Sequence, residues 1–175
     1  MNSSEVRFPA LAVKTMVCHT ITYFFMGALA AHFLHYADMM AKPESGMRPM
    51  TSAWVMAGPL FQPLRGLVFA TVFYPLRGCL FGRKYSWLIL GWMLVGLGIL
   101  STFGPASGSI EGMVYTPTPV LLQLRGWLEV VPQALLFAAL LAYWVEHPRK
   151  FLNWLLGTVF TVLMAMPVLG LLTHR

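Results

Sequence analysis

The chain has 175 residues, of which 58% are hydrophobic and only 10% are charged. Ordinary soluble domains carry about 25% charged residues, so this composition excludes an ordinary water-exposed surface as well as an intrinsically disordered chain. The chain contains 2 cysteines, too few for a disulfide-rich scaffold. The composition therefore predicts an all-α, polytopic integral membrane protein built as a bundle of apolar helices.

Five apolar stretches are long enough to be transmembrane helices, each of which needs about 20 residues. In chain order they cover residues 11–37, 53–76, 86–103, 120–145 and 151–172. The first stretch is long and interrupted by polar residues, so we interpret it as a retained span and not as a cleaved signal peptide. Together the spans predict a single transmembrane domain over residues 1–175.

The basic residues between the spans predict the orientation. Seven of them lie on the side of the membrane that holds the amino terminus: Arg7, Lys14, Arg77, Arg83, Lys84, Arg149 and Lys150. Lys42, Arg48 and Arg175 lie on the other side. The positive-inside rule then places the amino terminus in the cytoplasm and the carboxyl terminus outside, and we expect a bacterial inner membrane. Because this topology accounts for most of the net charge of +6, we expect membrane lipids as partners and no nucleic acid.

Two segments resemble each other at an offset of 60 residues. Residues 59–66 read PLFQPLRG and residues 119–126 read PVLLQLRG, and each segment has a glutamine shortly before its arginine, Gln62 and Gln123. Each segment begins a span and is followed by a charge-free span. This pattern predicts one leading helix followed by two two-helix repeats, a 1+2+2 organisation of the kind that transporters use. Chance similarity in a biased composition is the alternative.

Apart from Lys14 near the start of the first span, three charged residues fall inside the predicted spans. Arg65 and Arg125 each follow a span-starting proline, and Glu129 is four residues after Arg125, on the same helix face. An arginine in mid-span costs about 2.5–3.5 kcal/mol on insertion scales. Because these residues leave one surplus positive charge, we expect them, with Gln62 and Gln123, to bind an anionic ligand. Structural hydrogen bonds to carbonyls freed by prolines, or snorkelling to the interface, are the alternatives.

A possible metal site lies at the predicted outer end of the first span. His32, His35 and Asp38 are spaced by three residues, which places them on one side of a continuous helix. Imidazole and carboxylate ligands together suit zinc or iron, although further ligands would have to come from elsewhere. Polar residues that merely flank the interface are the simpler interpretation. The sequence indicates no particular cofactor.

These features support three hypotheses about function. The first is a small membrane protein, a homo-oligomer or a subunit of a larger complex, that binds or transports an anionic small molecule or lipid headgroup at an outward-facing site. The second is a membrane-embedded enzyme acting on lipid or isoprenoid substrates, with the arginines holding a developing anion and a metal as a possible helper. The third is a non-catalytic accessory subunit whose buried charges pair with those of a partner.

Overall fold

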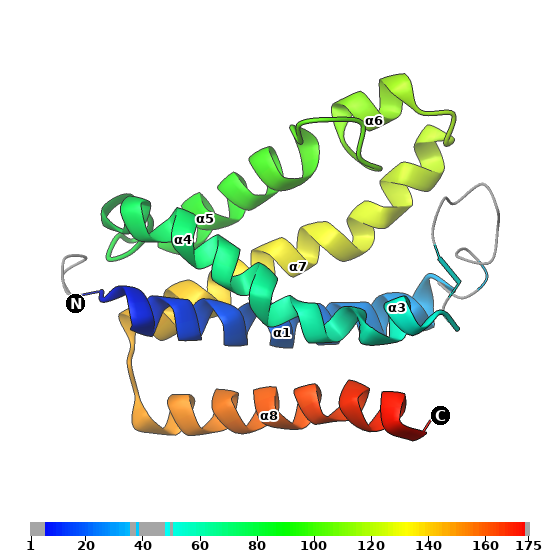
Figure 1. The fold of residues 1–175 in the computed structure, drawn as a ribbon. Helices are drawn as coiled ribbons and strands as arrows, with labels where there is room; N and C mark the ends of the chain where they lie inside the picture. The colour runs from blue at the N-terminus through cyan, green and yellow to red at the C-terminus, as the bar shows by residue number, and fades with distance from the viewer. Residues whose placement is uncertain (1–5, 36–37, 39–47, 50, 174–175) are drawn as a thin grey trace.

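The computed structural model describes residues 6–35, 38, 48–49 and 51–173. All regular structure in these ranges is helical, as the composition predicts. Four helical segments are long and apolar enough to cross a membrane: Phe8–Phe33, Ala53–Leu80, Val120–Glu146 and Lys150–Thr173. Figure 1 shows the helices running back and forth, so that the start of the first and the end of the last lie at opposite ends of the molecule. The all-helical fold is therefore confirmed for the described residues, with four helical segments that could span a membrane.

The first two predicted spans are found with shifted boundaries. Helix α1 (Phe8–Phe33) has a proline in its first turn, where the missing N–H is not needed, and it ends before the predicted boundary at residue 37. The second segment consists of α3 (Ala53–Ala57), a 3₁₀ turn η3 (Gly58–Phe61) and α4 (Gln62–Leu80). The prolines at the start of η3 and α4 are each placed in a first turn, where they are tolerated.

The third predicted span is shorter than the sequence indicates. Helix α5 (Ser86–Val95) continues into a π-helical turn, η4 (Gly96–Leu100), and the helix ends there rather than at residue 103. These residues span roughly 22 Å of helix, less than the roughly 30 Å of a hydrocarbon core. The chain then forms a loop and the short helix α6 (Ile110–Tyr115) before the next span. A count of five full-length spans is thus not confirmed.

Helix α1 occupies the centre of the bundle. It packs against α4, against α7 (Val120–Glu146) and against α8 (Lys150–Thr173), while α5 packs along α7. Figure 1 shows α8 on one side of α1 and the α4, α5 and α7 group on the other. Phe73, Leu90 and Phe137 are among the buried residues of the core. Leu156 is the one buried residue that α8 contributes within the described chain, so α8 is a peripheral helix.

Candidate functional site

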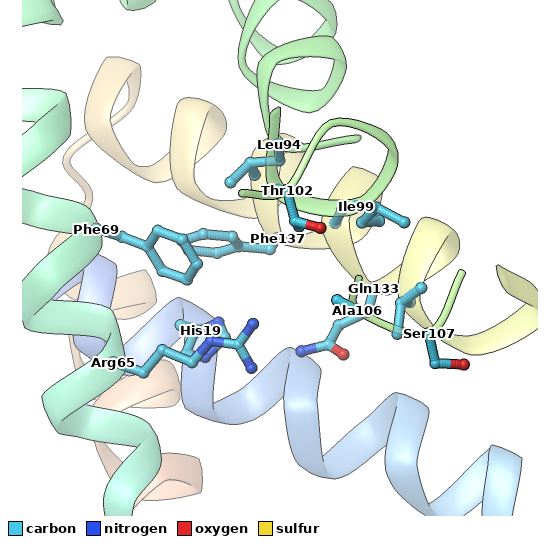
Figure 2. Close-up of a pocket in the computed structure, with 13 residues that line it drawn as sticks. His19, Arg65, Phe69, Leu94, Ile99, Thr102, Ala106, Ser107, Gln133 and Phe137 are labelled. Carbon is cyan, nitrogen blue, oxygen red and sulfur yellow. The ribbon is translucent and has the colours of Figure 1, made fainter. Parts of the chain in front are cut away.

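A cavity of about 180 Å³ lies between α1, α4, α7 and the η4 end of α5. Its apolar wall is made by Phe69, Leu94, Ile99 and Phe137. Its polar groups are His19 from α1, Arg65 from α4, Gln133 from α7, and Thr102 and Ser107 from the loop after η4. Figure 2 shows the two phenylalanine rings above the Arg65 and His19 side chains. The cavity is therefore amphipathic, because a cation and aromatic rings both line it.

His19 is held in one orientation by a hydrogen bond and two aromatic rings. Its Nε2 lies 3.1 Å from Oε1 of Gln62 across the α1–α4 interface, and both side chains are buried. The Gln62 amide nitrogen donates to the Gly58 carbonyl at 3.3 Å, so its oxygen accepts and His19 Nε2 donates. The rings of Phe69 and Phe137 meet the imidazole edge-on, with centroids 5.1 and 5.3 Å away. The imidazole is thus a fixed part of the cavity wall.

Arg65 brings a positive charge to this cavity. It follows Gln62 by one turn of α4, and its guanidinium carbon lies 5.7 Å from the centroid of the Phe69 ring. Its side chain is exposed and lines the cavity. Figure 2 shows the Arg65 guanidinium and the Gln133 amide reaching into the same space from opposite sides. Hydrogen-bond donors of α4 and α7 therefore face a common volume.

Glu129 lies near the same group of residues. It sits on α7 one turn before Gln133 and is half-buried. Tyr23 of α1, itself half-buried, lies within electrostatic range of both Glu129 and Arg65. The structure therefore brings Arg65, Gln62 and Glu129 to one region of the bundle, around His19 and Tyr23.

Arg125 has a different environment. Its Nη2 donates to the backbone carbonyl of Leu34 at 3.3 Å, directly after the end of α1. A cation at a helix carboxyl terminus is stabilised by the helix dipole. Arg125 does not line the cavity that Arg65 faces. The two arginines of the sequence repeat consequently occupy unlike surroundings.

The Gln123 side chain forms hydrogen bonds with the loop that precedes α7. Its Oε1 accepts from the backbone N–H of Gly108 at 3.0 Å. Its Nε2 lies 2.8 Å from the carbonyl of Thr118, 3.1 Å from that of Gly112 and 3.2 Å from the hydroxyl of Thr116. Because Gln123 is buried and all its partners belong to this loop, it stabilises the loop, whereas Gln62 orients a cavity residue.

The residues of the suggested metal site do not share a helix. His32 lies in the last turn of α1, but α1 ends at Phe33, so His35 and Asp38 lie beyond it. His35 adopts a φ of 48°, which breaks the helical spacing. Within the described ranges no three His, Cys, Asp or Glu side chains are grouped as metal ligands. The spacing argument for a shared helix face was therefore wrong.

Three comparisons with known proteins find no match to this chain, whether among family models, curated proteins or solved structures. The site is therefore interpreted from its own geometry.

Sequence reasoning did not assign the cavity residues His19, Gln133, Phe69 and Phe137 to the site. A signal for His19 was present, because Thr15 and Thr22 lie four residues before and three residues after it on a mostly apolar helix. All three are buried. The threonine hydroxyls donate to carbonyls of their own helix, while His19 bonds to another helix. Gln133 and the phenylalanines carry no comparable signal.

Proposed function

We propose that this protein binds an anionic amphiphile, a small molecule or lipid with one acidic headgroup, at the cavity that Arg65 faces. The observation that supports this most directly is the Arg65 guanidinium, which lines a cavity that aromatic rings also line. A guanidinium offers five donors in a planar fork that matches a carboxylate or phosphate. The headgroup would lie on Arg65 and Gln133, and its apolar part against Phe69 and Phe137.

The energetic case rests on the location of this charge. An arginine within a span is expensive unless it is paired or reaches water. Hydrogen bonds to a charged group contribute about 1.5–3 kcal/mol each, so an anion on Arg65 would offset much of that expense. Tyr23 lies within electrostatic range of both Arg65 and Glu129. Exchange of Arg65 between Glu129 and an incoming anion would be one way to couple binding to transport.

The test compares two arginines from matching positions of the repeat. The purified protein in mild detergent is titrated with oleate and, as an uncharged control ligand, monoolein, and binding is measured by native mass spectrometry. Arg65→Ala is expected to weaken oleate binding about tenfold or more, since one charged hydrogen bond is lost. Arg125→Ala also removes one positive charge, but this charge lies on α7 beside the end of α1 and outside the cavity. This variant should therefore leave oleate binding unchanged. Equal affinity of wild type and Arg65→Ala for oleate would exclude this site.

Flux separates binding from transport. Proteoliposomes containing wild-type protein are loaded with a fluorescent fatty acid, and its release is followed with time. Transport predicts release that is faster than from protein-free vesicles and that Arg65→Ala abolishes. Tight binding without such release would identify the protein as a binding module.

We further propose that α5 and η4 complete a fifth crossing, with the amino terminus in the cytoplasm of a bacterium and the carboxyl terminus outside. The alternating helix directions in Figure 1 and the basic residues at one end support this topology. In a Cys79→Ser background, Ser107→Cys should react with an impermeant maleimide on intact cells and Pro148→Cys should not. The reverse labelling pattern would show that the protein has the opposite orientation in the membrane. The 1+2+2 repeat stays a prediction.

An oligomer or larger complex is also part of this proposal. Helix α8 exposes most of its apolar surface, including Phe151, Trp154 and Leu169. Lipid or a second protein chain can cover such a surface. The mass of the purified complex, measured by light scattering with the detergent contribution subtracted, distinguishes a monomer from an oligomer.

A further inference from the structure

A second cavity, of about 360 Å³, lies at the end of the bundle where α4 turns into α5. It is separate from the cavity of Arg65, and the two cavities share no lining residue. Its polar and aromatic lining consists of Arg83, Lys84, Ser86, Trp87, Tyr143 and Glu146. The first four come from the turn and the start of α5, and the last two come from the final turns of α7. This is the end of the molecule at which most basic residues lie.

The turn that carries the two cations is firmly anchored. Ser86 is buried, and its hydroxyl accepts from the N–H of Arg83 at 3.0 Å and donates to the carbonyl of the same residue at 2.9 Å. Gly82, with a φ of 81°, donates its N–H to Oε1 of Glu146 at 2.9 Å. The backbone is thus tied to itself and to α7. The Arg83 and Lys84 side chains remain exposed.

These cations are available to a ligand. Within the described chain Arg83 makes no side-chain hydrogen bond, and Lys84 Nζ lies 5.3 Å from the centroid of the Tyr85 ring. The Glu146 carboxylate already accepts from Gly82. The cavity therefore has two cations and one carboxylate engaged by the backbone, which leaves one net positive charge.

Aromatic and apolar side chains border the cations. Trp87 and Tyr143 are 41% and 47% exposed, and such residues are enriched at the level of lipid headgroups. Leu88 and Ile89, next along α5, are 44% and 41% exposed and continue the apolar surface toward the membrane core. An acyl chain could follow this surface while its phosphate stays at the turn. A soluble phosphate would make no use of it.

We propose that this cavity is a binding site for the headgroup of an anionic phospholipid. Arg83 and Lys84 contact the phosphate, and Trp87 and Tyr143 pack against the glycerol and the first acyl carbons. Lysine and arginine near an anionic membrane surface each contribute attraction, and an arginine can engage phosphate oxygens through two parallel hydrogen bonds. The anchored turn holds both cations at one depth.

The experiment measures lipid binding to the full chain in detergent by native mass spectrometry. Dioleoylphosphatidylglycerol is compared with dioleoylphosphatidylcholine, which has the same chains and no net charge. We expect wild type to prefer phosphatidylglycerol about tenfold. The double variant Arg83→Ala/Lys84→Ala should lose at least about fivefold in phosphatidylglycerol affinity. Arg149→Ala/Lys150→Ala removes the same charge at the same end but outside the cavity, and it should stay within about twofold of wild type.

Three results would overturn the proposal. Equal losses in the two double variants would show attraction by general surface charge only. Equal binding of the two lipids would remove the requirement for an anion. Displacement of phosphatidylglycerol by millimolar glycerol phosphate would identify a soluble phosphate ligand instead. Trp87→Ala leaves the charge unchanged and is expected to weaken lipid binding about threefold, so the proposal stays testable if the double variant is unstable.

Discussion

Gly66 of α4 lies directly against the backbone of Met16 in α1. A Cβ atom on Gly66 would come within 2.6 Å of the Met16 Cα, a distance that real Cβ contacts essentially never show. Small residues at helix interfaces allow such close approach in membranes. Since Gly66 directly follows Arg65, this contact fixes the position of α4 on α1 beside the candidate site.

Substitution of Gly66 by alanine should therefore be costly. The added methyl group has to separate α1 from α4, and overpacking of this kind costs about 1–3 kcal/mol. Gly126 occupies the matching repeat position and has no atom within 4 Å of its would-be Cβ. Gly126→Ala should leave stability equal or slightly higher, because alanine favours a helix by up to about 1 kcal/mol. Thermal unfolding in detergent compares the two variants. Equal melting temperatures for Gly66→Ala and Gly126→Ala would contradict the close contact between α1 and α4.

The His19–Gln62 hydrogen bond should be energetically coupled. Gln62→Leu leaves the buried His19 Nε2 without its partner, at an expected loss of about 1–3 kcal/mol in the free energy of unfolding. His19→Leu leaves the Gln62 oxygen unpaired in the same way. The double variant should lose clearly less than the sum of the two single losses. Chemical unfolding of all four proteins gives the coupling energy, and strict additivity would show that the bond contributes nothing.

Gln123 should determine the order of the loop between η4 and α7. Gln123→Leu removes the partners of the Gly108 N–H and of the Gly112 and Thr118 carbonyls. We expect faster chymotryptic cleavage at Phe103 and Tyr115, both of which are exposed. Gln133→Leu is the control, because it changes a glutamine of the same helix that faces the cavity. In this variant, cleavage at Phe103 and Tyr115 should match wild type. An unchanged cleavage rate in Gln123→Leu would show that other contacts hold the loop.

The attachment of α8 should depend on one side-chain pair. Trp144 of α7 donates its Nε1–H to Oδ1 of Asn153 in α8 at 2.7 Å. Asn153→Leu removes this bond, which contributes about 0.5–1.5 kcal/mol. Because α8 buries little else, we expect faster hydrogen exchange throughout α8. Thr161→Val is the control, since the Thr161 hydroxyl bonds only to the Gly157 carbonyl in the same helix; comparable exchange in both variants would contradict the role of Asn153.

Composition and apolar run length were enough to predict an all-helical fold with helices that could span a membrane, because a chain in lipid must satisfy its backbone hydrogen bonds within helices. They did not predict where helices end. The apolar run from Ser86 continues to residue 103, but Gly96 and Gly98 favour the helix weakly, and the helix changes to a π turn at Gly96. Likewise, α1 ends at Phe33, although the three-residue spacing of His32 and His35 would suit one face of a continuous helix.

The site was predictable in part. Arg65 was identified because a charge inside a span is costly, and this cost does not depend on the fold. Arg125 carries the same sequence signal, but its partner is the Leu34 carbonyl at the end of α1. Only the packing of α7 against α1 shows this. His19 became a site residue for a similar reason, because its partners lie 43 residues away on another helix and across the cavity on α7.

In the proposed five-crossing topology, the short α5–η4 segment has a consequence for the surrounding bilayer. A hydrophobic element of roughly 22 Å is accommodated by local thinning of the lipid or by headgroups drawn toward its end. That end, at Gly98 and Ile99, is part of the wall of the Arg65 cavity. Hydrophobic mismatch would thus bring the aqueous boundary to the cavity wall, so that an acidic headgroup could approach Arg65 without crossing a full leaflet of hydrocarbon.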